Sequence, residues 1–177
     1  MSGVEMHTSE ETMILDSVDR FLERDVRPVV RELEASDTYP QSIVDRMIEL
    51  GLFGATISTE YGGLGLSATT YASIIERISA VWMSVSGIVN SHLIMAAAVQ
   101  RFGTARQKTH YLPRFASGEL RGGIGLTEPD CGTDLQGIRT QAVGEDDHYV
   151  VNRAKTWITN SAEGGILAVL VKTDRRA

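Results

Sequence analysis

The chain has 177 residues, and its hydrophobic content of 42% is enough for a sizeable core in one domain, or in one domain and part of a second. The formal net charge of -6 gives the chain as a whole no basic surface, so nucleic-acid binding is not expected. The lone cysteine, Cys131, excludes an internal disulfide, and the cysteine spacing of a metal site is absent.

The sequence shows no targeting segment. Its first residues lack a basic stretch followed by an apolar run, so we expect no secretory signal. The most apolar stretch, residues 88–99, is interrupted by Asn90, Ser91 and His92, and we therefore expect no membrane span. We expect a cytoplasmic protein.

The first helix is expected from residue 8 to residue 33. Thr8 and Glu11 have the spacing of a capping box, and apolar residues follow at steps of three and four as far as Leu33. Pro28 should kink or split this helix, because proline removes an amide donor and clashes with the preceding turn.

Four more helices are expected before residue 120. Gly51 and Gly103 are placed to end helices, and Thr104 with Gln107 forms a second capping box. The segment before Gly103 is apolar on most sides, which is typical of a helix buried in a bundle. The predicted ranges are 40–50, a helix capped by Ser67 or Thr69 that runs to 78, 85–102, and 104–115.

After Gly118 the pattern changes to short apolar runs separated by turns, which predicts strands. We therefore expect an α+β fold with a helical domain over residues 1–120 and an incomplete β domain over residues 121–177. So few strands leave sheet faces and edges uncovered. The predicted strands are 124–127, 138–143, 149–151, 156–159 and 166–172.

The segment 125–134, GLTEPDCGTD, is a polar loop that is long for a simple turn. The hydroxyls of Thr127 and Thr133 can donate and accept hydrogen bonds, and Gly132 allows close approach of the backbone to another group. Such a cluster could bind the edge of a heterocycle and a pyrophosphate, or it could be a self-stabilised loop without a ligand. For Cys131 we expect a packing role rather than a nucleophilic one, because nothing in the sequence indicates a histidine that would activate its thiol.

Two further side chains are open to two readings. Trp157 and Thr159 would share one face if residues 156–159 form a strand, so the indole could fill the core or wall a ring-shaped ligand. His92 lies in an apolar helix and could be a hydrogen-bonded core residue or a catalytic one. The segment 61–66 lacks the glycine spacing of a dinucleotide site and is expected to be a tight connection.

Four motifs in one order resemble the N-terminal part of an acyl-CoA dehydrogenase. They are EYGGLGLS (60–67), FGTARQKTHYLPRFASGEL (102–120), GIGLTEPDCGTD (123–134) and KTWITN (155–160). The resemblance implies an all-α helical bundle followed by a partial antiparallel β-barrel-like domain. It also implies that the C-terminal helical domain of the family, with its catalytic glutamate, is absent from this chain.

The resemblance further implies FAD as cofactor and an acyl-CoA thioester as substrate. FAD would be bound by Ile124, Leu126, Thr127, Gly132, Thr133, Trp157, Ile158 and Thr159. The substrate would contact Thr133, Asn90, His92 and Met95. No metal site and no catalytic residue are expected in this chain.

The implied reaction introduces an α,β double bond into the thioester, with an electron-transferring flavoprotein as acceptor and a homo- or hetero-tetramer as assembly. Two alternatives stay open: a non-catalytic short subunit of a heteromeric assembly, and a flavin monooxygenase or nitroalkane oxidase of the same fold. Five positions depart from the family pattern. Ile124 stands where an aromatic residue is frequent, and Thr133 where serine is usual. Asp130 and Cys131 replace smaller residues, and the added charge is expected to alter substrate preference. Arg153 stands where glycine completes a turn, so a different turn or some strain is expected there.

Overall fold

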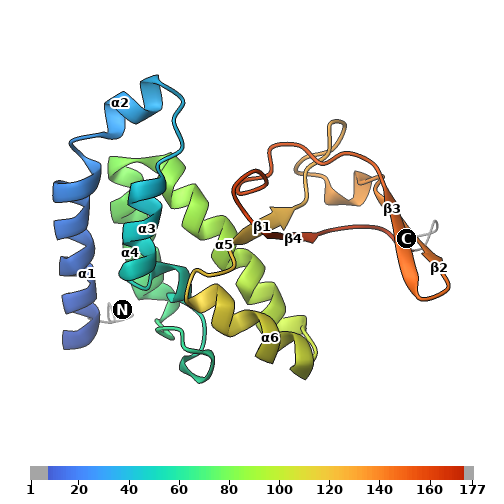
Figure 1. Ribbon diagram of the computed structural model, residues 1–177, viewed down its shortest axis with the longest axis horizontal. Coiled ribbons are helices and arrows are strands. Elements are labelled where there is room, and N and C mark those ends of the chain that lie inside the picture. Colours follow the sequence, from blue (N-terminus) through green and yellow to red (C-terminus); the bar gives the residue numbers. More distant parts are fainter. Residues whose placement is uncertain (1–7, 174–177) are drawn as a thin grey trace, which may run out of the picture.

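The structure is a computed structural model that describes residues 8–173. Figure 1 shows a helical bundle and a smaller β part that extends from one side of it, which confirms the predicted α+β class. The helices are α1 (Ser9–Phe21), α2 (Val30–Ala35), α3 (Gln41–Glu49), α4 (Ala68–Val81), α5 (Met83–Phe102) and α6 (Ala105–Ala116). The strands are β1 (Gly122–Gly125), β2 (Gln141–Glu145), β3 (His148–Asn152) and β4 (Ile166–Val169).

Local capping signals set the helix starts, as predicted. The Thr8 hydroxyl accepts from the Glu11 amide at 3.2 Å, and the Glu11 carboxylate accepts from the Thr8 amide at 2.9 Å. The same reciprocal pair joins Thr104 and Gln107 at the start of α6. Of the two candidate caps for α4, the structure uses Ser67, whose hydroxyl accepts from the Thr70 amide at 3.2 Å.

The first predicted helix is split, as Pro28 required. After α1 the chain makes one π-helical turn over Leu22–Val26, and α2 begins only at Val30. Proline cannot donate the amide hydrogen bond that a continuous helix needs at this point. Figure 1 shows α2 turned away from the axis of α1.

Helix α5 is the central helix of the bundle and contacts α4, α6 and β1. Its buried side chains include Val85, Val89, Leu93 and Ala96. By length and composition α5 could also cross a membrane, but 44% of its most apolar window is buried inside the protein, as in the core helix of a bundle. Burying one large aliphatic side chain contributes about 1.5–3 kcal/mol, so this packing dominates the stability of the bundle.

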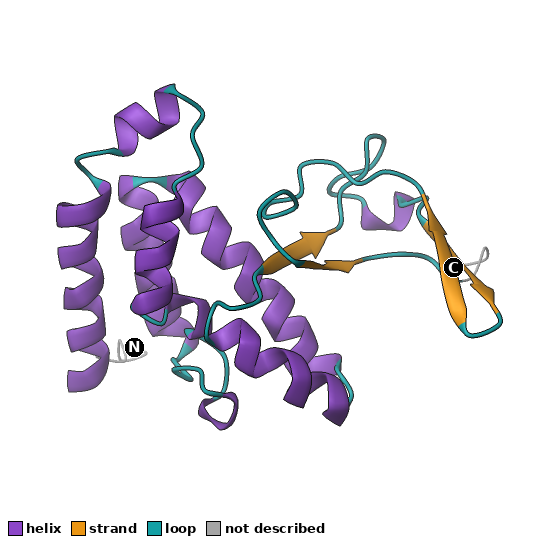
Figure 2. Cartoon of the chain, in the orientation of Figure 1, coloured by secondary structure: helices purple, strands orange, loops and turns teal. Residues whose placement is uncertain are grey.

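The β part consists of two separate pairs of strands (Figure 2). Strands β1 and β4 run parallel, from Gly122 opposite Ile166 to Gly125 opposite Val169. Strands β2 and β3 form an antiparallel hairpin. The expected antiparallel pairing therefore holds for the hairpin only, and the strands of residues 8–173 do not close into a barrel.

The predicted strand at residues 156–159 is wrong, because these residues form an irregular segment with a bend at Trp157 and a turn that begins at Thr159. Trp157 has a φ of 57° and Asn160 a φ of 66°, and positive values of φ interrupt an extended chain. The alternation that placed Trp157 and Thr159 on one face therefore does not apply. The first two strands also lie at 122–125 and 141–145 rather than at 124–127 and 138–143.

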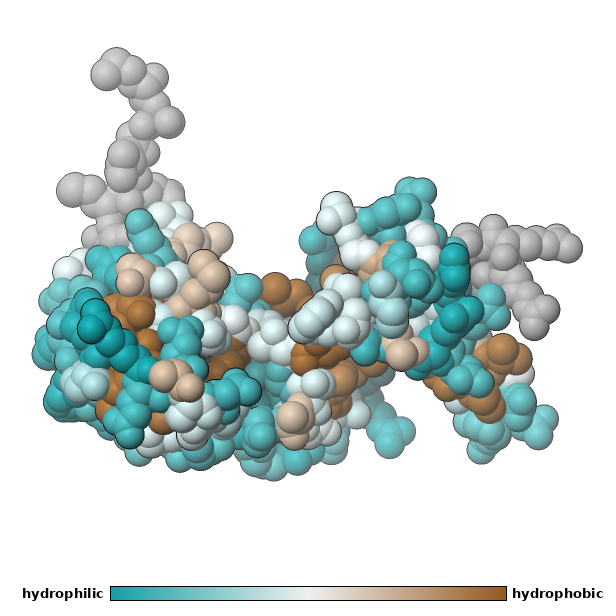
Figure 3. All heavy atoms as spheres, turned by 90° about the horizontal axis from the view of Figure 1, so that it is seen from above, coloured by the Kyte–Doolittle hydropathy of each residue, from teal (hydrophilic) through white to brown (hydrophobic). Residues whose placement is uncertain are grey.

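Figure 3 shows apolar side chains exposed among hydrophilic ones, over both the helical part and the β part. The most exposed large hydrophobic side chains are Trp157, Phe102, Met83, Met13 and Tyr149. Of these, only Trp157 belongs to a segment that the sequence assigned to ligand binding.

Substitution of Gly122 by alanine should lower the free energy of unfolding by about 2 kcal/mol or more. A Cβ atom at Gly122 would lie 2.0 Å from the Ile166 carbonyl oxygen and 2.9 Å from the Met95 sulfur, so β1 would have to move. Urea unfolding measures the change. The control is Gly87→Ala in α5, where no atom lies within 4 Å of the added Cβ and helix propensity should raise stability by up to about 1 kcal/mol. Equal stability of the two variants would contradict the packing described for β1.

Candidate functional site

The candidate site forms where β1 and the following loop meet the segment 155–160. The Thr156 amide donates to the Thr127 carbonyl at 3.0 Å. The Asn160 side-chain amide donates to the carbonyls of Ile88 in α5 and Gly122 in β1, at 2.9 and 2.8 Å. These bonds bring the predicted residues of 124–127 next to those of 157–159.

The carboxylate of Glu128 organises the loop. The residue is buried, and its carboxylate accepts from the Arg139 amide at 2.7 Å, from the Thr140 amide at 3.0 Å and from the Thr140 hydroxyl at 2.5 Å. Its backbone pairs in both directions with that of Cys131. Burial alone would raise the pKa of Glu128, but these hydrogen bonds and one from Lys155 outweigh it and lower the pKa to about 2.

Lys155 joins the two halves of the site. Its ammonium donates to the Glu128 carboxylate and to the Leu126 carbonyl, both at 2.9 Å. The two charged side chains are only 12% and 4% exposed, so the ion pair is largely shielded from water. The sequence prediction quoted Lys155 and Asn160 within the KTWITN motif but gave neither a role. The partners of Lys155 are 27 and 29 residues away in sequence, and those of Asn160 are 38 and 72 residues away. No local pattern in the sequence therefore shows these contacts.

The residues predicted to contact a ligand expose groups that the described chain does not use. The hydroxyls of Thr127, Thr133 and Thr159 make no hydrogen bond with any residue between 8 and 173. Trp157 is 89% exposed, which excludes the core reading of its indole within this chain. No atom lies within 4 Å of a Cβ built on Gly132, so the backbone there is open to approach. This surface can hydrogen-bond and stack against a planar ligand.

Three of the four residues predicted to contact a substrate, Asn90, His92 and Met95, lie in α5, which packs against β1, whereas Thr133 lies in the loop after β1. His92 and Met95 are 0% and 1% exposed, and Asn90 is half-buried and accepts from the Tyr71 hydroxyl at 2.5 Å. His92 lies between the rings of Phe53 and Phe115. The core reading of His92 agrees with this geometry. The contacts of His92 and Met95 with a substrate stay predictions that their burial does not favour.

His92 joins α5 to its neighbours through both ring nitrogens. Nε2 lies 3.2 Å from the Phe115 carbonyl, and Nδ1 accepts from the Gly122 amide at 3.4 Å. This pattern requires a neutral ring that carries its proton on Nε2. Burial lowers the pKa of His92 to about 4.

Cys131 is buried and its thiol donates to the Asp134 carbonyl at 2.7 Å, which agrees with the expected packing role. Arg153 has a φ of 141°, so the strain expected at this turn is present. Between residues 8 and 173 no group of histidine, cysteine, aspartate and glutamate side chains is arranged to hold a metal ion.

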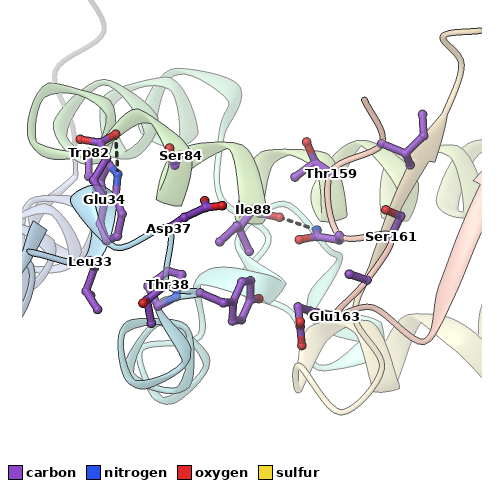
Figure 4. Close-up of a pocket in the computed structure, with 15 residues that line it drawn as sticks. Leu33, Glu34, Asp37, Thr38, Trp82, Ser84, Ile88, Thr159, Ser161 and Glu163 are labelled. Carbon is purple, nitrogen blue, oxygen red and sulfur yellow. Dashed lines mark hydrogen bonds between the residues drawn. The ribbon is translucent and has the colours of Figure 1, made fainter. Parts of the chain in front are cut away.

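A cavity of about 410 Å³ lies beside the site (Figure 4). It is bounded by the connection from α2 to α3, by the start of α5 and by residues 158–163. Figure 4 shows the Trp82 indole, which donates to Glu34 at 3.3 Å. The Asn160 side-chain amide also lines the cavity and donates to the Ile88 carbonyl. Of the residues predicted to bind a ligand, Ile158 and Thr159 line this cavity.

The stability of the protein should fall when the pH drops from about 7 to about 5. The folded-state pKa of His92 lies below that of an unfolded histidine, so the unfolded chain takes up a proton that the folded chain excludes. The contribution of the neutral His92 to the free energy of unfolding is fully present above about pH 6.5 and is lost as the pH falls toward about 4. At pH 5 the free energy of unfolding should be lower by about 2 kcal/mol. Urea unfolding at both pH values measures it.

His92→Gln is the matched control, since it removes the titrating group and should flatten the dependence. The carboxylates of Glu11 and Glu128, with pKa values of about 2, lose their stabilising contribution mainly below this window. An equal free energy of unfolding of the unsubstituted protein at both pH values would contradict the assignment.

Comparison with known proteins adds an independent finding. The family profile described as "Acyl-CoA dehydrogenase, N-terminal domain" matches residues 8–119, and the profile described as "Acyl-CoA dehydrogenase, middle domain" matches residues 123–177. A short-chain-specific acyl-CoA dehydrogenase of Clostridium acetobutylicum is 36% identical over 169 residues, which cover 95% of this chain and 45% of that protein.

Two solved structures extend the comparison. The structure titled as the electron transferring flavoprotein of Acidaminococcus fermentans matches with a TM-score of 0.92 and 32% identity, over 98% of this chain and 46% of that chain. An acyl-CoA dehydrogenase of Bacillus anthracis complexed with FAD matches with a TM-score of 0.86 and 35% identity, over 97% and 30%. The chain therefore spans less than half the length of these relatives.

Proposed function

The chain belongs to the acyl-CoA dehydrogenase family, and on that premise we propose that it supplies the FAD-binding surface of a flavin-dependent oxidoreductase acting on acyl-CoA thioesters. The reaction introduces an α,β double bond into the acyl group. We infer from the resemblance to the family that the α-proton is removed by a glutamate of the family's C-terminal helical domain, and we assign no catalytic base within residues 1–177.

The observation that carries this proposal is the set of unused polar groups around an exposed tryptophan. Thr127 and Thr159 are brought together by the bond between Thr156 and Thr127, and their hydroxyls have no partner between residues 8 and 173. Trp157 directly follows Thr156, and its exposed indole presents a flat apolar surface. A planar heterocycle with polar edges, such as the flavin of FAD, has the matching shape and chemistry.

Each residue has a definite role in this proposal. The Leu126 backbone and the Thr127 side chain would hold the pyrimidine edge of the flavin, with Ile124 nearby. Thr133 would hold the pyrophosphate, and Gly132 would leave room for it. Trp157 and Ile158 would pack beside the ring system, and the Thr159 hydroxyl would donate a hydrogen bond to it. FAD, when bound, supplies the two-electron chemistry, while these residues orient it and tune it.

Glu128 is not the catalytic base in this proposal. Its carboxylate accepts hydrogen bonds from Arg139, Thr140 and Lys155, and its pKa of about 2 makes it a poor proton acceptor at neutral pH. A base must also reach the substrate, whereas Glu128 is 5% exposed.

The wider biochemical setting follows from the family. We infer a cytoplasmic tetrameric enzyme that passes electrons to an electron-transferring flavoprotein and takes part in fatty acid metabolism. The substrate contacts expected of Thr133, Asn90, His92 and Met95 are part of this proposal, and Thr133 is the most exposed of them.

The test is anaerobic reduction of the natural full-length protein. We expect it to purify with bound FAD, and addition of an acyl-CoA should bleach the flavin absorbance. FAD binding without bleaching by any thioester would instead favour a monooxygenase or nitroalkane oxidase of the same fold. Bleaching that requires a second, copurifying chain would indicate a short subunit in a heteromeric assembly. A protein that binds no FAD would contradict the proposal.

Removal of single hydroxyls should weaken FAD binding. Thr127→Val and Thr133→Val each delete one hydrogen bond, and we expect the Kd for FAD to rise about tenfold in each variant. Titration of the apoprotein with FAD, followed by flavin fluorescence, measures the Kd. Thr109→Val on the exposed face of α6 is the matched control and should leave the Kd within about twofold. The roles assigned to the two hydroxyls are wrong if all three variants bind FAD equally.

A further inference from the structure

The ion pair between Glu128 and Lys155 lies behind the surface proposed to bind FAD. The Lys155 ammonium and the Glu128 carboxylate are 2.9 Å apart and are 12% and 4% exposed. Neither residue is among those expected to touch the cofactor. The pair can therefore affect cofactor binding only through the backbone groups that it binds.

Lys155 fixes the start of the loop after β1. Its ammonium binds the Leu126 carbonyl at 2.9 Å, and one residue later the Thr156 amide binds the Thr127 carbonyl at 3.0 Å. Two consecutive carbonyls of the loop are thus held by two consecutive residues of the segment that continues into Trp157. With these carbonyls held by Lys155 and Thr156, the Thr127 hydroxyl is left for a ligand.

Glu128 fixes the other end of the same loop. Its carboxylate gathers the Arg139 and Thr140 amides, which precede β2, and its backbone pairs with that of Cys131. The turn that carries Gly132 and Thr133 is consequently anchored through one buried charge. Loss of the positive partner would leave that charge buried and incompletely compensated, which is strongly unfavourable.

We propose that Glu128 and Lys155 are positioning residues of the flavin site, whose ion pair sets the spacing between Thr127 on one side and the Trp157–Thr159 segment on the other. This inference rests on the proposed function, because it concerns the geometry of the FAD contacts. The pair touches no part of the cofactor and acts through the backbone of residues 126–128 and 156–157.

The test uses the natural full-length protein with Lys155→Met, which keeps the length of the side chain and removes its charge. We expect the Kd for FAD to rise at least about tenfold. At saturating FAD, the visible absorption and circular dichroism of the bound flavin should also shift, because its hydrogen-bond donors are displaced. A purely structural role would lower the melting temperature without changing the spectrum of the flavin that is bound.

Two companion variants make the result specific. Lys155→Arg keeps the positive charge and should recover most of the affinity and the spectrum. Asp130→Asn breaks the solvent-exposed pair between Asp130 and Arg139 on the same loop, where the side chains are 65% and 61% exposed, and should leave the Kd within about twofold. Far-UV circular dichroism checks that the helical bundle is intact in each.

If Lys155→Met does not fold, Glu128→Gln carries the same test from the other side, since it removes the charge but keeps the size. Wild-type affinity and an unchanged flavin spectrum in the folded variant would overturn the positioning role. A wild-type protein that binds no FAD would overturn the proposed function instead, so the two failures are distinguishable.

Discussion

The contact between α5 and β1 is the constraint on which the rest of the structure depends. β1 can lie against the central helix only because its first two residues are glycines. A Cβ on Gly123 would meet the Thr159 carbonyl at 2.4 Å and the Ser91 hydroxyl at 2.7 Å. The Gly122 amide donates to His92, and its carbonyl accepts from Asn160. The helical bundle, the first strand and the segment 155–160 are thus joined at one place.

A second feature is that two charged side chains, rather than pairing between strands, hold the backbone of the loop after β1. Residues 126–140 contain no strand, yet their backbone is held in a defined shape. The Glu128 carboxylate accepts hydrogen bonds from two backbone amides and a hydroxyl, and the Lys155 ammonium donates one to a backbone carbonyl. A hydrogen bond to a charged group is about twice as strong as a neutral one, so a few side chains can replace a ladder. Such a network is sensitive to mutation, because removal of one side chain leaves the others with unsatisfied hydrogen bonds.

The helices could be predicted from the sequence because their signals are local. The capping boxes at Thr8 and Thr104 and the break at Pro28 involve residues within a few positions of one another. The segment 156–159 could not, because its shape is set by partners that are far away in the chain: Thr127, which accepts from Thr156, and Glu128, whose carboxylate accepts from the neighbouring Lys155. The residues predicted to bind a ligand were chosen from their motifs, whereas the residues that hold their backbone, Glu128, Lys155 and Asn160, become evident only from contacts in three dimensions.

The two tryptophans have a consequence for how this protein can be observed. Trp82 is 6% exposed and packed in the helical bundle, whereas Trp157 is 89% exposed. Their fluorescence therefore reports on two different places, with Trp82 emitting from an apolar environment and Trp157 from water. Each indole can be removed singly to leave the other as the one tryptophan among these 177 residues. The chain thus contains separate intrinsic optical probes for the integrity of its core and for events at the exposed surface around residue 157.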